Sequence, residues 1–238
     1  MSTVRASPSL RQRIRETLDV IVTRDPSVRS RTEALLHPTV LTLLGHRTGH
    51  FLYRHRRYVT ARLVCTATKV LTGGIEIHPG AQIGRRFFVD HGSGVVVGET
   101  AVIGDDVSLF HQVTLGSFGW WREEDARHGT RRHPRLGNGV TVGAGATLLG
   151  PITVSDDALI GAMSLVLSDV PKGVHVRAPQ AVIEQVPRSF TAADRGPGTQ
   201  GGAENVPAGR RPARTPSDGP RTDVQPPHRN GSERTHES

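Results

Sequence analysis

The sequence predicts an all-α N-terminal region followed by a left-handed parallel β-helix of hexapeptide repeats. An aliphatic residue recurs every six positions through most of residues 77–166, and Gly or Asp follows many of these positions. This period fits neither a 3.6-residue helical turn nor a two-residue strand alternation. It suits a short strand plus a turn, three of which close one triangular coil. Gly and Asp tolerate the left-handed backbone that tight corners require. A β-sandwich is disfavoured, because its irregular loops would not keep a six-residue register.

Two breaks interrupt the register of aliphatic positions, and inserted residues must leave a coil as loops. The interval from Val95 to Ile103 is eight residues, which predicts a small bulge at 97–100 whose Glu and Thr are either functional or structural. The interval from Leu115 to Leu136 is twenty-one residues. It predicts an extruded loop over residues 116–135 that contains both tryptophans.

Residues 1–73 are expected to form a helical domain. Apolar residues recur at helical spacing over 10–21, 27–36, 39–56 and 58–71. Asp25 precedes Pro26 and is expected to form a turn or N-cap between the first two helices. His46 and His50 lie one helical turn apart, but the carboxylate of a zinc-protease helix is missing, which favours a packing role.

The β-helix is expected to occupy residues 74–186, with residues 174–183 forming a last strand or cap. Residues 187–238 contain eight of the sixteen prolines and few large apolar side chains, so a disordered tail is expected.

Composition narrows the functional classes. The formal charge is +8, but aromatic residues make up only 4%, so stacking on nucleic acid bases is not expected. The single cysteine, Cys65, excludes an internal disulfide. Neither a signal peptide nor a run of eighteen apolar residues occurs, so we expect a cytoplasmic protein without a membrane segment.

Three short segments carry histidine in a context suited to chemistry: residues 76–79, 89–92 and 131–134. A histidine beside glycine and an acid in a solenoid turn is a candidate general base, and a carboxylate can hold its tautomer. Neither serine nor cysteine lies in a nucleophile-elbow context. The sequence therefore favours direct attack on a bound donor without a covalent enzyme intermediate.

Several motifs resemble those of the serine O-acetyltransferases, the hexapeptide enzymes that make O-acetylserine for cysteine biosynthesis. The motifs are GIEIHPGAQIG, VDHGSGVVVGETAVIGDDVSL, VTLG, RHP and VTVGAGATLLGPITV, and the helical segment RDPSVRSRTEALL…HRTGHFLYRH is similar to the family's N-terminal region. The resemblance covers roughly residues 22 to 180. It implies transfer of the acetyl group from acetyl-CoA, as co-substrate, to the hydroxyl of L-serine.

The resemblance also implies roles for individual residues. His91 would be the general base, Glu76 would orient it, and His133 would line the pocket and assist proton handling. The remaining assignments are Asp25 and Asp90 for the serine amino group, Arg132 for its carboxylate, and Gly116, Ala144 and Ala162 for acetyl-CoA in a groove between subunits. Neither a tightly bound cofactor nor a metal is implied.

The expected assembly is a homotrimer or a dimer of trimers. Family members dock into cysteine synthase through a terminal isoleucine, whereas this chain ends at Ser238. Docking to cysteine synthase through the C-terminus is therefore not expected.

Three alternatives stay open on sequence alone. The acceptor could be homoserine or another hydroxyl compound, because one methylene discriminates by only about 1 to 3 kcal/mol. His128 and His133 stand five residues apart, which suggests a zinc enzyme of the γ-carbonic anhydrase kind. A non-catalytic assembly subunit with the same fold is the third.

Overall fold

A computed structural model describes residues 9–119 and 130–182, in which four helices precede a β-helix. The helices are α1 (Leu10–Arg24), α2 (Arg31–Ala34), α3 (Pro38–Arg54) and α4 (Tyr58–Leu71). The helix expected over 27–36 is only four residues long. The Ser30 side chain accepts the Glu33 N–H and starts the helix, and a turn at Leu35 ends it. In the described ranges, each helix is too short or too polar to cross a membrane.

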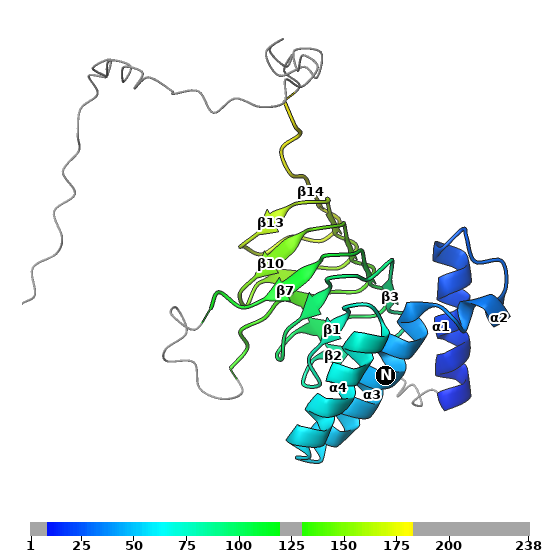
Figure 1. The fold of residues 1–238 in the computed structure, drawn as a ribbon. Coiled ribbons are helices and arrows are strands. Elements are labelled where there is room, and N and C mark those ends of the chain that lie inside the picture. The colour runs from blue at the N-terminus through cyan, green and yellow to red at the C-terminus, as the bar shows by residue number, and fades with distance from the viewer. Residues whose placement is uncertain (1–8, 120–129, 183–238) are drawn as a thin grey trace, which may run out of the picture. The chain divides into compact units, whose positions relative to one another are not determined.

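The strands form three parallel sheets that the chain visits in rotation as far as β13, after which β14 joins sheet C, and they are stacked from β1 near the helices to β14 at the far end (Figure 1). Sheet A contains β1 (Glu76–Ile77), β4 (Val96–Val97), β7 (Thr114–Gly116), β10 (Thr147–Leu149) and β13 (Leu165–Val166). Sheet B contains β2 (Gln82–Ile83), β5 (Val102–Ile103), β8 (Arg135–Leu136) and β11 (Thr153–Val154). Sheet C contains β3 (Phe88–Val89), β6 (Ser108–Leu109), β9 (Thr141–Val142), β12 (Leu159–Ile160) and β14 (His175–Val176).

The predicted hexad residues fill the interior of the coils. Val89, Leu109, Leu115, Val142 and Ile160 are each at most 1% exposed. The prediction of helices followed by a parallel β-helix of short repeats is confirmed, and β14 is the expected last strand. The division into separate domains near residues 73 and 186 stays a prediction.

The first break in the register lies elsewhere than predicted. Val97, not Val95, pairs with Ile77 below and Leu115 above, so Val97 holds the inward hexad position. Val97 to Ile103 is then an ordinary interval of six, and the two additional residues fall between Val89 and Val97. The predicted bulge at 97–100 is wrong because residues two apart in a strand share a face, and both valines are buried.

The second break is confirmed. Strand β7 ends at Gly116 in sheet A and β8 begins at Arg135 in sheet B, so the insertion leaves the coil at that corner. Residues 120–129, including both tryptophans, lie outside the described residues. So do residues 187–238, for which disorder was expected.

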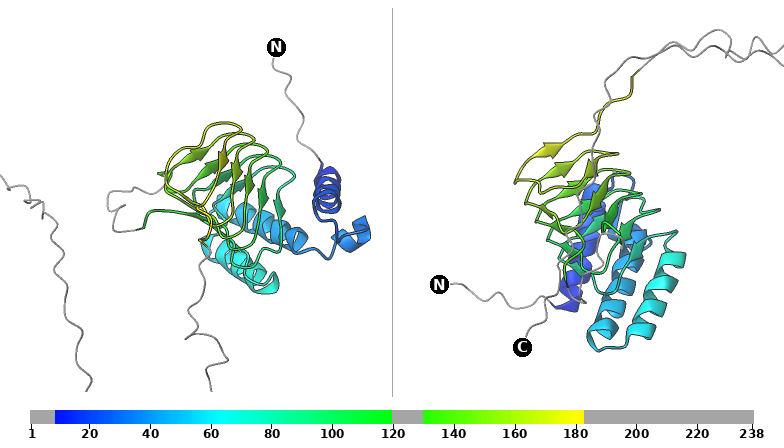
Figure 2. Two further views of the ribbon diagram at one scale, coloured as in Figure 1. Left: turned by 90° about the horizontal axis from the view of Figure 1, so that it is seen from above. Right: turned by 90° about the vertical axis from the view of Figure 1, so that its left-hand side faces the viewer.

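Helices α3 and α4 lie side by side against the first coils (Figure 2). Three side chains of α3 bond to the coil backbone. The Thr39 hydroxyl donates to the Val89 carbonyl over 3.0 Å. His46 Nε2 donates to the Ala81 carbonyl over 3.1 Å and His50 Nδ1 to that of Pro79 over 2.8 Å. The packing role expected for these histidines is confirmed.

Candidate active site

The chain passes from sheet C to sheet A at one corner of every coil, and we call this line of corners the C/A edge. In the first coil this corner is the segment 90–94, where the additional residues fall. His91 and Gly92 have φ of 57° and 63°, and two tight turns join the Gly92 N–H to the Asp90 carbonyl and the Ser93 N–H to the His91 carbonyl. A Cβ on Gly92 would lie 2.3 Å from Ile75 Cδ1, so only glycine fits. The corner leaves the His91 side chain 78% exposed.

Three of the predicted site residues gather at this corner. The Asp90 carboxylate lies 3.7 Å from His91 Nε2. Asp25 lies near enough for the charge of His91 to contribute to the lowered pKa of its carboxyl, although hydrogen bonds from Ser27 are the main cause. One coil further on, the His111 ring stands edge-on to His91 with 6.1 Å between ring centroids. His111 Nδ1 is buried and has no hydrogen-bond partner among residues 9–119 and 130–182.

Asp25 is held by the turn between α1 and α2. Its Oδ1 accepts the Ser27 backbone N–H over 2.9 Å and the Ser27 hydroxyl over 2.6 Å. Its Oδ2 lies 3.6 Å from Nε2 of His37, the N-cap residue of α3. Sequence reasoning missed His37, and the signal that marks it is a histidine directly before the proline that starts a helix.

Two residues predicted for acetyl-CoA continue the C/A edge above His91. Ala144 lies between β9 and β10, and Ala162 lies between β12 and β13. Backbone bonds join successive corners, from the Gly145 N–H to the His111 carbonyl and from the Met163 N–H to the Ala144 carbonyl.

The other predicted residues lie at the A/B edge, the line of corners where the chain passes from sheet A to sheet B. Here Thr100 is the centre of a hydrogen-bond network. Its hydroxyl oxygen accepts the N–H of Arg132 over 2.8 Å and that of His133 over 3.2 Å, and the hydroxyl lies 2.8 Å from His133 Nδ1. His133 is 8% exposed. A Cβ on Gly98 would lie 1.9 Å from His133 Cδ2, so glycine lets the imidazole pack on the backbone.

Glu99 links this network to helix α3. It accepts the Tyr53 hydroxyl over 2.6 Å and an Arg132 N–H over 3.2 Å. The Tyr53 bond is the main cause of the lowered pKa of Glu99, and that same bond raises the pKa of Tyr53 to about 12. Beside these groups lies a cavity of about 690 Å³, lined in part by Tyr53 and His78. Burial lowers the pKa of His78 to about 4. The role of Tyr53 could not be predicted from a sequence motif, because its partner Glu99 is forty-six residues away in the chain.

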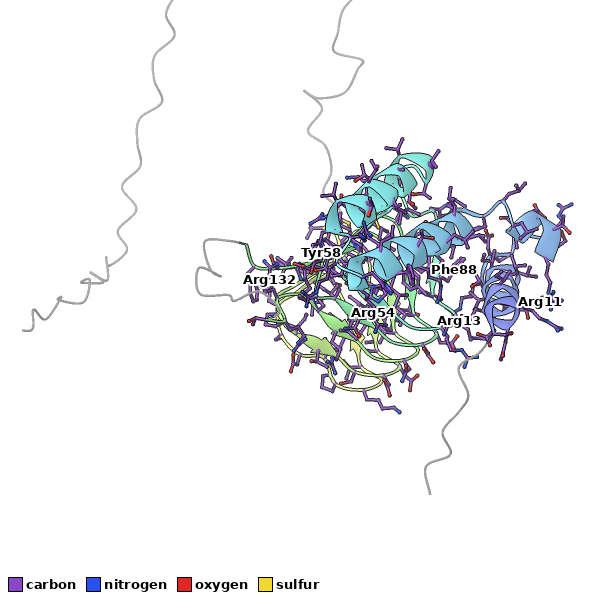
Figure 3. The ribbon with its side chains drawn as sticks, turned by 90° about the horizontal axis from the view of Figure 1, so that it is seen from below. Arg11, Arg13, Arg54, Tyr58, Phe88 and Arg132 are labelled. Carbon is purple, nitrogen blue, oxygen red and sulfur yellow. The ribbon has the colours of Figure 1, made fainter. Side chains whose placement is uncertain are left out.

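The two edges flank sheet A and lie apart. Figure 3 shows Phe88, which precedes Asp90 by two residues, well separated from Arg132. Gly116 ends β7 at the A/B edge, away from Ala144 and Ala162. The contacts of Asp90 and His91 described above are made at the C/A edge, and those of Thr100 and Glu99 with Arg132 and His133 are made at the A/B edge.

Glu76 lies at the start of β1 on sheet A. Its carboxylate accepts from Lys69 Nζ over 2.5 Å. Within the described ranges it makes no hydrogen bond to His91, and its predicted role as the partner of His91 stays a prediction. Residues 9–119 and 130–182 contain no group of three His, Cys, Asp or Glu side chains placed to hold a metal ion. His128, part of the zinc alternative, lies outside the described residues.

Comparison with known proteins identifies the relatives. No family model matches the chain. A serine acetyltransferase of Helicobacter pylori is 49% identical over 158 residues, which are 66% of this chain and 88% of that protein. The chain belongs to the serine acetyltransferase family. Among solved structures, soybean serine acetyltransferase complexed with serine has 40% identity and a TM-score of 0.65, covering 74% of this chain and 70% of that one.

A serine acetyltransferase of Brucella abortus in complex with coenzyme A has 34% identity and a TM-score of 0.63, covering 73% of this chain and 67% of that one. Both structures agree with the β-helix described above. The predictions of the family, the fold and an acyltransferase enzyme are confirmed.

Proposed function

We propose that this chain transfers the acetyl group of acetyl-CoA to the hydroxyl of L-serine, giving O-acetyl-L-serine and CoA. His91 takes the hydroxyl proton while the serine oxygen attacks the thioester carbonyl. The C–S bond then breaks, and the sulfur leaves as the thiol of CoA with a proton from the imidazole. The observation that carries this proposal is the His91 imidazole, exposed on a strained corner beside two carboxylates in a chain of this family.

The C/A edge supplies the charges that an amino group requires. Asp25 and Asp90 face the same space as His91, and the lowered pKa of Asp25 keeps that carboxylate ionised near neutral pH. An ammonium group bound there would leave the acceptor hydroxyl close to His91. Proximity of this kind accounts for a large part of many enzymatic rate enhancements.

The A/B edge supplies the complementary recognition. The Arg132 guanidinium can bind a carboxylate through two parallel hydrogen bonds, and Glu99 holds its orientation. His133 lies next to it in a buried hydrogen-bond network, where we propose that it lines the acceptor pocket and assists proton handling. Glu76 is proposed to orient His91 after exchanging its bond with Lys69.

Acetyl-CoA is proposed to lie along the C/A edge, with its thioester near His91. Ala144 and Ala162 lie at this edge in the coils above His91, and their small side chains leave room for the pantetheine arm. Gly116, at the end of β7, would contact this co-substrate from the neighbouring subunit. The coenzyme A complex of the Brucella relative supports this co-substrate.

We infer that one active site takes its C/A edge from one subunit and its A/B edge from the next, in a homotrimer or a dimer of trimers. The separation of the two groups of predicted residues across sheet A supports this arrangement, because one serine molecule must reach both.

An acceptor panel tests the reaction. Purified chain with acetyl-CoA should release CoA with L-serine, and more slowly with homoserine, threonine or no acceptor. Turnover with homoserine above that with serine would contradict the proposed acceptor. Hydration of CO₂ that needs added Zn²⁺ and no acetyl-CoA would favour the alternative of a zinc enzyme of the γ-carbonic anhydrase kind.

Two substitutions test the roles of His91 and Glu76. His91→Ala should lower kcat by roughly 10² to 10⁴ with the KM for acetyl-CoA nearly unchanged, because only the proton acceptor is lost. Glu76→Gln should lower kcat less, and should add almost nothing in the double variant, because residues acting as a unit are non-additive. His55→Ala, an exposed histidine at the end of α3, is the control. Retained kcat in His91→Ala would contradict the mechanism.

A further inference from the structure

His37 joins helix α3 to the carboxylate that we propose binds the acceptor amino group. It is the N-cap residue of α3, and its Nδ1 accepts the Thr39 N–H over 3.2 Å. The opposite ring nitrogen, Nε2, lies 3.6 Å from Asp25 Oδ2. The ring stacks on Phe88 with 5.5 Å between centroids, and the side chain is only 9% exposed.

These contacts fix the tautomer of His37. Because Nδ1 accepts a backbone hydrogen bond, the proton of the neutral imidazole must be on Nε2. The proton is therefore on the ring nitrogen that lies 3.6 Å from Asp25 Oδ2. Burial lowers the pKa of His37, with Asp25 and Asp90 opposing and His91 reinforcing the shift. The lowered pKa favours the neutral ring at neutral pH, which leaves the negative charge of Asp25 available. The 3.6 Å from Nε2 to Oδ2 is slightly longer than a hydrogen bond, so a small movement of either side chain is needed to form one.

Asp25 has one oxygen to offer a ligand. Both Ser27 hydrogen bonds go to Oδ1, so Oδ2 is the atom left for an ammonium group. His37 is the side chain beside Oδ2 in the described residues. A carboxylate without that contact could rotate about its Cβ–Cγ bond, which would lower its affinity for an amino group.

We propose that His37 is a positioning residue for the acceptor site, whose Nε2–H holds Asp25 Oδ2 toward the amino group of the acceptor. This inference rests on the proposed function, since it assumes that Asp25 binds the acceptor. It assigns His37 a second role in addition to capping α3.

One substitution separates the two roles. His37→Asn keeps the cap, because asparagine is among the best N-cap residues, but its short side chain cannot reach Asp25 while capping. We expect the KM for serine to rise about three- to tenfold, with kcat and the KM for acetyl-CoA within about twofold. The melting temperature should stay within about 2 °C. His37→Leu should raise KM similarly and also lower the melting temperature, because the cap is lost as well.

The controls distinguish failure of this inference from failure of the proposed function. Ser9→Ala removes the N-cap of α1 far from the site and should change stability only. If Asp25→Asn raises the KM for serine but His37→Asn does not, His37 is only a cap and the inference is wrong. If the wild-type chain does not acetylate serine, the proposed function fails and this inference fails with it.

A titration gives a readout that a purely structural role would not change. The nearby groups that titrate or carry charge are Asp25, Asp90 and His91. By NMR, Asp25→Asn should lower the pKa of His37 further, because it removes a charge that favours the imidazolium. In the wild type, the KM for serine should rise as pH falls through the lowered pKa of His37, because the imidazolium then neutralises Asp25. His37→Asn should lack the part of this rise that is due to His37. If the KM for serine rises identically at acid pH in both proteins, the inference is overturned.

Discussion

The C/A edge and the A/B edge carry the candidate site in opposite ways. At the C/A edge, His91 is exposed on a left-handed corner, with carboxylates nearby and few hydrogen bonds to hold its ring. At the A/B edge, His133 is buried and bound to Thr100, and Arg132 is tied through Glu99 to Tyr53. A base that exchanges protons with a substrate must be accessible, whereas groups that recognise a fixed carboxylate gain from a rigid frame. Each edge is therefore suited to a different half of the reaction.

Neither edge is sufficient alone. The C/A edge provides a base and negative charge but no cation for a carboxylate, and the A/B edge provides the cation but no exposed base among the described residues. A working site must therefore join both edges, and the first question is whether the two edges come from one chain or from two.

The largest expected effect is a recovery of activity in mixed trimers. His91→Ala and Arg132→Ala should each be nearly inactive alone, because each lacks one edge. Co-expressed with different tags, they should regain about one third of wild-type turnover in mixed trimers, since each mixed trimer has one site of three in which an intact C/A edge meets an intact A/B edge. The measurement is serine-dependent CoA release by doubly tagged complexes.

A matched pair on one edge is the control. His91→Ala with Asp90→Ala should recover nothing, because neither chain supplies an intact C/A edge. If His91→Ala and Arg132→Ala also recover nothing while forming mixed trimers, both edges of the site belong to one chain.

The sequence predicts much of this fold because each coil of the β-helix is specified by a short local repeat. One inward aliphatic per hexad is enough to specify a coil, and residues such as Leu109 and Leu148 are fully buried as expected. The register predicted at the first break was wrong. Val95 and Val97 are both buried, and the sequence alone does not choose between them. The strand pairing of Val97 with Leu115 decides it, and shows that the inserted residues form the His91 corner.

Site residues could be predicted from the sequence only where several reactive side chains lie together in one short motif. Asp90 and His91 are adjacent in sequence, and Arg132 and His133 likewise. The contacts of Tyr53 with Glu99, of Thr100 with His133 and of His37 with Asp25 join residues far apart in the chain. The first contact depends on how α3 docks onto the coils, the second on where the insertion returns to them, and the third on how the start of α3 packs on the turn after α1. No local pattern specifies any of the three.

A smaller effect tests the rigid frame of the A/B edge. Thr100→Val keeps the shape but removes the hydroxyl, which accepts the N–H groups of Arg132 and His133 and lies 2.8 Å from His133 Nδ1. The backbone N–H of residue 100 still donates to His133 Nδ1. An unsatisfied buried group costs about 1 to 3 kcal/mol, so the KM for serine should rise about tenfold or more. The KM for acetyl-CoA should stay nearly constant, because, in the described part of the chain, the Thr100 hydroxyl contacts Arg132 and His133 and none of the three residues proposed to bind acetyl-CoA. Thr100→Ser retains the hydroxyl and should behave like the wild type. Equal kinetics in all three proteins would show that the network does not position Arg132.

The smallest effect concerns the bond that ties the A/B edge to α3. Tyr53→Phe removes the donor to the Glu99 carboxylate and should destabilise the chain by about 1 kcal/mol at pH 7, since Glu99 is partly exposed. The folded-state pKa of Glu99 is lowered, so this contribution is present above the unfolded-state pKa and is lost as pH falls through the folded-state value. Urea unfolding at pH 7 and near pH 3 should therefore show a difference between wild type and Tyr53→Phe that shrinks in acid.

Tyr58→Phe is the matched control, because the Tyr58 ring contacts Tyr53 edge-on without a hydrogen bond to Glu99. A Tyr53→Phe deficit that is the same at both pH values would mean that ring packing, and not the bond to an ionised Glu99, connects the A/B edge to the helices.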